Sequence, residues 1–335
     1  MMKLAEIQAA CGVLCVDLAA VVDNYQTLAR HVAPAQCGAV LKANGYGLGA
    51  EAIAPALYAA NCRIFFVAQL SEGVALRKIL SADAMVVLLN GVMPQAMPLC
   101  CAQQITPLLN SVDQVMAWLA AIFRQRGWAA PDYIISHLAN ADRPDHALNV
   151  YQHTLLQQAK EAFPTSRYSL ANSCGMFLHP AWREDLCRPG VALFGVAQPW
   201  FSTPLKPAFT LTLSILRVQD VPVGTPIGYG STVTTTRPLR IATVSAGYAD
   251  GIPRNLRPPA GVCWRGVRLP VLGRVCMDSF MVDASAIMPT PGDVVEFIGV
   301  SQTLEEVAAA CDTIPYEIMT RLGGRFRRIM QPAEA

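Results

Sequence analysis

The feature that most constrains the fold is an alternation of short apolar runs with longer helical patterns along the first two thirds of the chain. The runs are rich in β-branched and aromatic residues, as in "RIFFVAQL" and "AMVVLLNG". The segments between them repeat apolar residues at helical spacing, as in "SEGVALRKIL". Strands that are apolar throughout are typical of parallel sheets covered on both faces. We therefore predict an α/β fold with a TIM-like (β/α) barrel.

Seven such runs can be recognised before about residue 205, whereas a complete TIM barrel has eight strands. In chain order they are "CGAVLKA", "RIFFVAQL", "AMVVLLNG", "ITPLLNS", "DYIISHLAN", "RYSLANS" and "RPGVALFG".

After that point, proline and glycine punctuate short alternating runs such as "RIATVSAGYADG" and "GDVVEFIGV", which is typical of an antiparallel β domain. The proline-marked "STPLKP" is a plausible linker. We predict an N-terminal strand within residues 1–17 that packs with the C-terminal domain, a cofactor-binding barrel over residues 18–205, and a C-terminal β domain over residues 206–335.

Composition excludes several classes of partner. The 335 residues carry a formal net charge of +2, with no basic patch of the kind that nucleic acid requires. The eleven cysteines form no disulfide framework and no metal motif, which favours the reducing cytoplasm. The first residues make a poor signal peptide because Glu6 and Asp17 interrupt them, and the longest apolar stretches are too short to span a bilayer.

A single lysine, Lys42, stands where the first run ends, in "AVLKANGYGLG". The carboxyl ends of barrel strands carry the active site. An isolated lysine there is usually an amine that reaches out of the core into water. The three glycines that follow favour a binding role instead, because they let the backbone approach a ligand closely. A desolvated amine in such a pocket can form a Schiff base with a carbonyl cofactor, above all pyridoxal phosphate.

The stretch around Lys42 resembles the pyridoxal-phosphate attachment motif of alanine racemases. Further motifs of that family follow in the family's order: "SHLANADRPDH", "SLANSCG", "RPGVALFG", "IGYGSTV", "GYADGIPR", "GRVCMD" and "IPYEIM". The resemblance implies a cytoplasmic isomerase that uses pyridoxal 5'-phosphate to interconvert L-alanine and D-alanine, a D-amino acid of cell walls. It also implies a homodimer whose active sites are shared between subunits.

The resemblance assigns two opposed catalytic bases, because a racemase removes the Cα proton from one face and returns a proton to the other. Lys42 is the first base and also the cofactor lysine, and Tyr229 is the second, contributed by the partner subunit. His137 and Arg188 form the relay that stabilises the tyrosine phenolate, whose unperturbed pKa is near 10. Arg188 also pairs with the pyridine nitrogen, which stays unprotonated because arginine keeps its proton. Taken alone, Arg188 would more often be a surface ion pair and His137 a core histidine. Both are expected at strand ends that face the same side as Lys42, which favours a functional role.

Other residues are assigned to the cofactor phosphate and to the substrate. Hydroxyls and backbone amides at turns suit a phosphate, and the family pattern places Tyr46, Ser173, Gly190, Val191 and Tyr316 there. Ser173 is also compatible with a helix cap. Tyr248 matches a tyrosine that narrows the substrate entrance, and Met277 matches the residue whose backbone receives the substrate carboxylate. Charged residues expected either along the entrance or in ordinary surface ion pairs are Asp142, Arg254, Arg274 and Asp278.

The chain departs from the family pattern at one place in the barrel. The family has a strand with a motif of the form VDTGMxRLG before the "SHL" strand, and its arginine contacts the cofactor. Here "SVDQVMAWLAAIFRQRG" runs through "WAAP" directly into "DYIISHL", so about one βα unit, roughly 30 residues, is missing. Arg124 and Arg126 lie on a predicted helix end and are not assigned the lost role. A lesser departure is Leu48, where the family usually has histidine.

The loss of a strand leaves three possibilities for the barrel, because strand number, tilt and shear are coupled. It closes with seven strands, it opens at this point, or another segment fills the gap. Three functions follow: an alanine racemase, a catalytically impaired homologue that still binds pyridoxal phosphate, and a pyridoxal-phosphate decarboxylase or phosphosugar-type barrel enzyme. The second-domain motifs from "IGYGSTV" to "GRVCMD" argue against the third. We predict the racemase.

Overall fold

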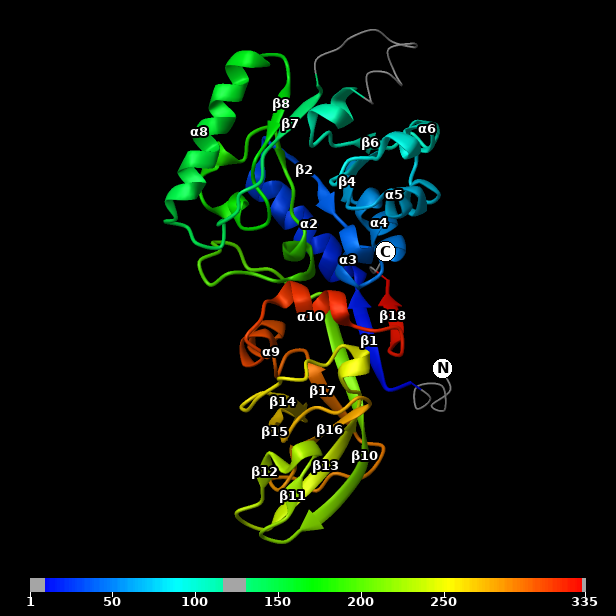
Figure 1. The fold of residues 1–335 in the computed structure, drawn as a ribbon, viewed down its shortest axis with the longest axis vertical. Coiled ribbons are helices and arrows are strands. Elements are labelled where there is room, and N and C mark those ends of the chain that lie inside the picture. The colour runs from blue at the N-terminus through cyan, green and yellow to red at the C-terminus, as the bar shows by residue number, and fades with distance from the viewer. Residues whose placement is uncertain (1–9, 117–130, 333–335) are drawn as a thin grey trace. The chain divides into compact units, whose positions relative to one another are not determined.

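The computed structural model describes residues 10–116 and 131–332 and divides into two compact units (Figure 1). The first unit runs from Leu18 to Lys206, and the second combines the segment ending at Asp17 with Pro207–Pro332. Arg124, Arg126 and most of the helix predicted over "SVDQVMAWLAAIFRQRG" lie outside the described residues.

The first unit alternates short parallel strands with helices. Its strands are β2 (Gln36–Cys37), β3 (Ala39–Val40), β4 (Ile64–Val67), β5 (Met85–Leu88), β6 (Thr106–Pro107), β7 (Tyr133–Ile135), β8 (Arg167–Ser169) and β9 (Leu186–Cys187). Its helices are α2 (Leu18–Val32), α3 (Lys42–Tyr46), α4 (Ala50–Ala59), α5 (Leu70–Arg77), α6 (Met97–Ala102) and α8 (Ala147–Ala162), with the 3-10 turns η1 (Pro94–Ala96), η2 (Gly175–Phe177), η3 (Pro180–Trp182) and η4 (Val191–Phe194).

Strand pairing gives the order of this parallel sheet. β3, β4, β5 and β6 pair in sequence, β7 pairs with β8, and β2 pairs with β9. A bridge between Asn172 and Arg188 joins the chain after β8 to the chain after β9. Since β2 and β3 form one strand interrupted at Gly38, the described barrel has seven strands, as the sequence predicts. In the described residues no pairing joins β6 to β7, so the barrel is open at this edge, which we call the seam.

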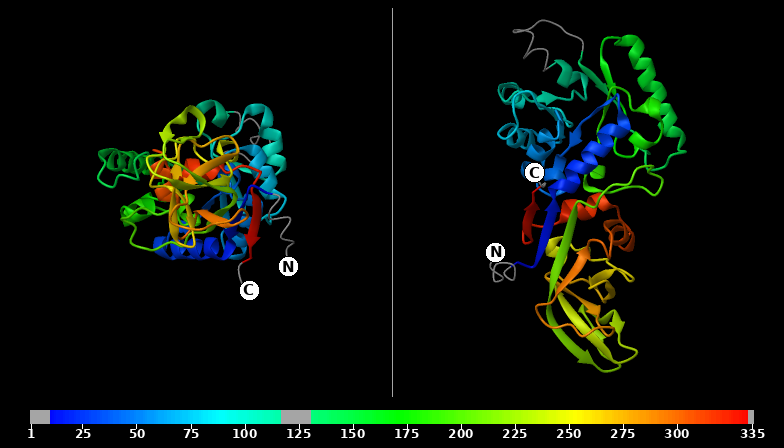
Figure 2. Two further views of the ribbon diagram at one scale, coloured as in Figure 1. Left: turned by 90° about the horizontal axis from the view of Figure 1, so that it is seen from below. Right: turned by 180° about the vertical axis from the view of Figure 1, so that it is seen from behind.

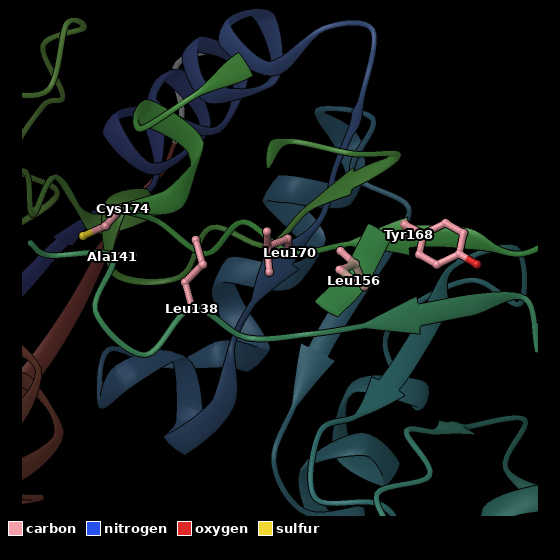
Figure 3. Packing of buried hydrophobic residues seen from close by; sticks show 6 residues of the cluster. All are labelled: Leu138, Ala141, Leu156, Tyr168, Leu170 and Cys174. Atoms are coloured by element: carbon pink, nitrogen blue, oxygen red, sulfur yellow. The ribbon is translucent and has the colours of Figure 1, made fainter. Parts of the chain in front are cut away.

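The barrel strands are covered on both faces. All four residues of β4 are buried. Phe65 and Phe66 follow one another in this strand and so point to opposite faces of the sheet, yet both are fully buried. Helix α8 covers β8 through Leu156, which belongs to a buried cluster with Tyr168 and Leu170 (Figure 3). The Tyr168 hydroxyl donates a 2.7 Å hydrogen bond to the Phe163 carbonyl at the end of α8. The continuous apolar character of the predicted strands therefore reflects burial from two sides.

The second unit is a mostly antiparallel β domain (Figure 2). Eight strands pair in the order β13-β16-β15-β14-β17-β10-β1-β18, and β13 also pairs with β10. They are β1 (Gly12–Asp17), β10 (Phe209–Val221), β13 (Leu239–Ser245), β14 (Gly261–Trp264), β15 (Val267–Leu272), β16 (Ser279–Asp283), β17 (Val294–Ile298) and β18 (Arg327–Gln331). A small hairpin of β11 (Pro226–Ile227) and β12 (Val233–Thr234), two 3-10 turns and the helices α9 (Leu304–Ala310) and α10 (Pro315–Arg321) complete it.

The N-terminal strand belongs to this second unit. β1 runs antiparallel to β10, where Leu14 faces Leu211, and parallel to β18. Burial alternates along β1 and along the first half of β10, so one face of each strand lies in the core. An α/β barrel joined to a mostly antiparallel β domain, the predicted fold class, is confirmed.

One predicted strand is different in the structure. The run "RPGVALFG" contains the 3-10 turn η4, and the strand β9 ends just before it at Cys187. Val191, Leu193 and Phe194 are all buried in this turn. A short apolar run that is buried on every side has no periodicity that distinguishes a strand from a turn. No helix in the described part of the chain is long and apolar enough to cross a membrane.

Candidate active site

Lys42 lies directly after β3, where it begins a turn of left-handed backbone. The φ angles of Ala43, Asn44, Gly45 and Tyr46 are 53°, 55°, 63° and 56°. This conformation costs an L-residue other than glycine roughly 1–2 kcal/mol. The turn leaves Lys42 exposed and buries Tyr46, so two residues four positions apart lie in different environments. Such strain persists only where surrounding contacts hold it, and it is concentrated at functional sites.

Three residues predicted to bind phosphate form one cradle. The Ser173 hydroxyl oxygen accepts hydrogen bonds from the backbone N–H groups of Gly190, at 2.9 Å, and Ala192, at 3.4 Å. The Tyr46 ring lies against Gly190, where a Cβ would come within 2.1 Å of its hydroxyl oxygen. Ser173 therefore binds the amides around η4 instead of capping the turn that follows it, whose cap is Cys174. Val191 is the first residue of η4.

Arg188 is a buried cation at the carboxyl end of a barrel strand. It follows β9 and is 4% exposed. Its guanidinium donates hydrogen bonds to the Ser136 carbonyl at 2.8 Å and to the Ser169 hydroxyl. In the described part of the chain no carboxylate forms an ion pair with it, so it is not a surface ion pair. Burial lowers the pKa of Arg188 to about 10, which leaves the group protonated at neutral pH.

His137 follows β7 and lies beside Arg188, with 3.4 Å between its Nδ1 and a guanidinium nitrogen. Desolvation, and then the positive charges of Arg188 and Lys42, lower the pKa of His137 to about 4. The ring is therefore neutral at neutral pH, although the residue as a whole is exposed. Lys42, His137 and Arg188 follow the carboxyl ends of the parallel strands β3, β7 and β9, and His137 contacts Arg188 there.

The second unit carries the remaining predicted residues on its own elements. Tyr229 begins the turn η5 (Tyr229–Ser231) and is 77% exposed. Tyr248 begins the turn η6 (Tyr248–Asp250). Its N–H donates a 3.0 Å bond to the Cys276 carbonyl, which places it beside Met277. Tyr316 is the second residue of α10.

The charged residues predicted for the entrance differ in their contacts. Asp278 accepts a 2.8 Å hydrogen bond from Arg325. The Arg274 guanidinium passes near Gly230, where a Cβ would lie 3.5 Å from it. Neither Asp142 nor Arg254 forms an ion pair within residues 10–116 and 131–332, and the entrance role of all four stays a prediction.

Two further residues, Asp250 and Ser169, hold these groups and are not among those predicted from the sequence. Asp250 is fully buried and accepts hydrogen bonds from the Gly247 N–H at 2.9 Å and from Arg325 at 2.8 Å. Burial acts to raise its pKa, but these hydrogen bonds lower it overall, so the carboxylate stays charged. It fixes the turn that carries Tyr248. Ser169 has the same kind of role for Arg188. The only sequence signal was that both lie within recognised motifs.

Comparison with known proteins covers both units. The family model of the alanine racemase N-terminal domain matches residues 16–131 and 118–198, and that of the alanine racemase C-terminal domain matches residues 208–330. "Alanine racemase 3" of Salmonella typhi is 89% identical over 368 positions, which span 100% of each chain. A catabolic alanine racemase of Agrobacterium fabrum is 40% identical, across 100% of this chain and 98% of that one.

A solved structure agrees with the fold. The alanine racemase of Bartonella henselae, with covalently bound pyridoxal phosphate, has a TM-score of 0.89 and 39% sequence identity. The match covers 96% of this chain and 100% of that one.

The alignment with the Salmonella typhi relative also shows that residues are missing from this chain. It has 368 positions, 33 more than the 335 residues of this chain, so the relative contains at least 33 residues without a counterpart here. Since 89% of 368 is about 328, nearly all residues that are present are identical. The two matches to the N-terminal family model overlap at residues 118–131, between β6 and β7. Apart from this one missing unit, the matches span both domains, and the chain belongs to the alanine racemase family.

Proposed function

We propose that this chain racemises alanine with pyridoxal phosphate attached to Lys42. The observation that carries the proposal is that Lys42, His137 and Arg188 all follow the carboxyl ends of parallel barrel strands, with His137 and Arg188 side by side. The relatives that match the whole chain are alanine racemases, which supports the same reaction and substrate.

The residues present fit this cofactor. The cradle of Tyr46, Ser173 and Gly190 combines hydroxyls with backbone amides, which suits a phosphate, and has room only because residue 190 lacks a Cβ. Lys42 supplies an exposed amine for covalent attachment. Arg188 supplies a buried donor that suits an unprotonated ring nitrogen. We further propose Val191 and Tyr316 as phosphate contacts, and Tyr248 and Met277 as substrate contacts.

The side chains of the protein then have separate roles in the reaction. Bound pyridoxal phosphate supplies the electron sink for the charge that develops at Cα when its proton leaves. Lys42 Nζ takes or returns that proton on one face, and Tyr229 Oη of the partner subunit does so on the other. Arg188 keeps its own proton and holds the ring nitrogen.

His137 completes the relay by its protonation state. Because the ring is neutral, an Nδ1 that accepts from Arg188 leaves the single ring proton on Nε2. That N–H can donate to the phenolate of Tyr229 and stabilise it. If the imidazole were protonated, its Nδ1 would carry a proton and could not accept a hydrogen bond from Arg188.

We propose a homodimer with shared sites and a cytoplasmic location. The exposure of Tyr229, 77% in the single chain, supports its availability to a partner. All eleven cysteines are free thiols, which supports a reducing compartment. The alternative of a catalytically impaired homologue is not favoured, because the relative at 89% identity is an alanine racemase and every proposed base is present.

Isotope exchange tests the reaction. Purified protein with pyridoxal phosphate and L-alanine in deuterated water is expected to form D-alanine that carries deuterium at Cα. Lys42→Ala should abolish both exchange and covalent attachment, whereas the control Lys78→Ala, on another exposed lysine, should leave both unchanged. Covalent attachment without exchange would refute the racemase.

Subunit mixing tests the shared site separately. Lys42→Ala and Tyr229→Phe are each expected to be inactive, and a mixture refolded together should recover about a quarter of wild-type activity, because half of the random dimers contain one intact site. No recovery from a mixture that contains hybrid dimers would refute the sharing of Lys42 and Tyr229 between subunits.

A further inference from the structure

The carboxylate of Glu72 in α5 accepts backbone hydrogen bonds from two different barrel loops. One oxygen accepts from the N–H groups of Ala68, at 2.9 Å, and Gln69, at 3.0 Å, in the loop after β4. The other oxygen accepts from the N–H of Asn44, at 3.2 Å, in the left-handed turn after β3. The first pair is an ordinary cap of α5, whereas the third bond leaves the helix and reaches the turn that carries Lys42.

This third bond supports the turn from outside. Within the turn, the N–H of Gly45 donates to the Leu41 carbonyl and that of Gly47 donates to the Ala43 carbonyl, both at 2.8 Å. The N–H of Asn44 donates instead to the carboxylate of Glu72. The Asn44 side chain in turn accepts from the N–H of Ala50, at 2.9 Å, at the start of α4. Asn44 therefore ties the strained turn to both helices that flank it.

The two ends of this turn carry the groups that the cofactor requires. Lys42 begins it, and Tyr46, which lies against Gly190 in the phosphate cradle, ends it. The backbone between them adopts a conformation that ordinary residues avoid, so its geometry depends on the contacts that hold it. We propose that Glu72 is a positioning residue, which holds the amine of Lys42 and the hydroxyl of Tyr46 at the spacing that pyridoxal phosphate needs. The cofactor part of this proposal rests on the proposed function.

Glu72→Gln is the sharpest variant. Its amide has the size of the carboxylate but only one accepting oxygen, so it can serve either the α5 cap or Asn44, and not both. Glu306→Gln is the matched control, because Glu306 accepts the N–H of Thr303, at 2.9 Å, in the same capping position of α9 in the other unit. The control therefore replaces the carboxylate of an equivalent cap, together with its ion pair to Arg268, far along the sequence from Lys42.

Two measurements test the proposal on the full-length protein. Amide hydrogen exchange without cofactor should show the Asn44 N–H exchanging about tenfold faster in Glu72→Gln, because a charge-assisted hydrogen bond is lost, and unchanged in Glu306→Gln. Titration with pyridoxal phosphate, followed by borohydride reduction and mass spectrometry of the Lys42 peptide, should show affinity and attachment rate about tenfold lower in Glu72→Gln alone.

The outcomes separate this proposal from the proposed function. An unchanged exchange rate at Asn44 would overturn the role of Glu72, as would equal losses of cofactor affinity in both variants. If wild-type protein failed to bind pyridoxal phosphate, the proposed function would fall, and the exchange measurement alone would still decide whether Glu72 holds the turn.

Discussion

At the scale of single residues, Gly190 decides whether Tyr46 and Ser173 can lie together in the cradle proposed to bind phosphate. Its backbone N–H bonds to Ser173 while its missing side chain makes room for the Tyr46 hydroxyl. In Gly190→Ala the new methyl group would lie 2.1 Å from that oxygen, so the buried tyrosine must move. We expect at least about tenfold weaker binding of pyridoxal phosphate, measured by absorbance titration. Gly324→Ala, which meets nothing within 4 Å, should bind normally, and equal affinities in the two variants would contradict the cradle.

His137 has a pKa that can be measured directly. Since desolvation and the charges of Arg188 and Lys42 lower it to about 4, its ring should not titrate in the range where an ordinary histidine does, near 6.5. Lys42→Ala removes one positive charge and should raise this pKa. NMR titration of the imidazole, assigned with a His137→Gln variant, measures both. A midpoint at or above 6.5 in the wild type would contradict the neutral relay.

The lowered pKa of His137 also determines how the stability of the protein changes with pH. Between pH 6.5 and about 4 the unfolded chain binds a proton at this position that the folded chain does not. His137 therefore favours folding above that window, and its contribution is lost as the pH falls through it. Urea unfolding of the protein without cofactor should show a weaker loss of stability across this window in His137→Gln than in the wild type.

At the scale of elements, the sequence predicts what periodicity and burial determine. The strand in "RIFFVAQL" and the helix in "ALNVYQHTLLQQAKEAF" appear in the structure as β4 and α8. Long-range contacts determine the rest. The left-handed turn after Lys42 depends on Glu72, 28 residues from Asn44, and the burial of η4 depends on the surrounding barrel. The three glycines of "AVLKANGYGLG" indicated a close approach of the backbone to a ligand, but nothing in the sequence indicated the left-handed backbone of Ala43 and Asn44.

Replacing alanine by glycine should affect stability differently in that turn and in a helix. Ala43 has a φ of 53°, which glycine adopts without strain, so Ala43→Gly should leave stability unchanged or raise it by up to about 1 kcal/mol. Ala56→Gly, within α4, should lower stability by about 1 kcal/mol, because glycine disfavours a helix interior. Urea unfolding of the protein without cofactor measures both. Equal destabilisation would show that Ala43 does not have left-handed backbone in solution.

At the scale of the whole molecule, the missing βα unit is the main departure from the relatives. The sequence located it, but could not choose between a closed seven-stranded barrel and an open one, because closure depends on the coupled tilt and shear of all the strands. In the described residues the barrel is open between β6 and β7. Elements on both sides of the seam expose large apolar side chains, which are Met93, Leu99, Val112 and Met116 on one side and Val150, Tyr151 and Leu155 of α8 on the other.

Restoring the unit should therefore stabilise the barrel. We expect that inserting the corresponding residues of the Salmonella typhi relative at the junction within residues 118–131 would pair the free edges of β6 and β7 and cover apolar surface next to them. The melting temperature should rise by roughly 5–10 °C, since each kcal/mol is worth roughly 2–4 °C in a unit of this size. Binding of a dye specific for exposed apolar surface should fall. A glycine-serine insert of equal length can pair no strand and should change neither quantity. If both inserts behaved alike, the seam would not be a stability defect, and the seven strands would have to be held by contacts other than the pairing that a closed parallel barrel provides.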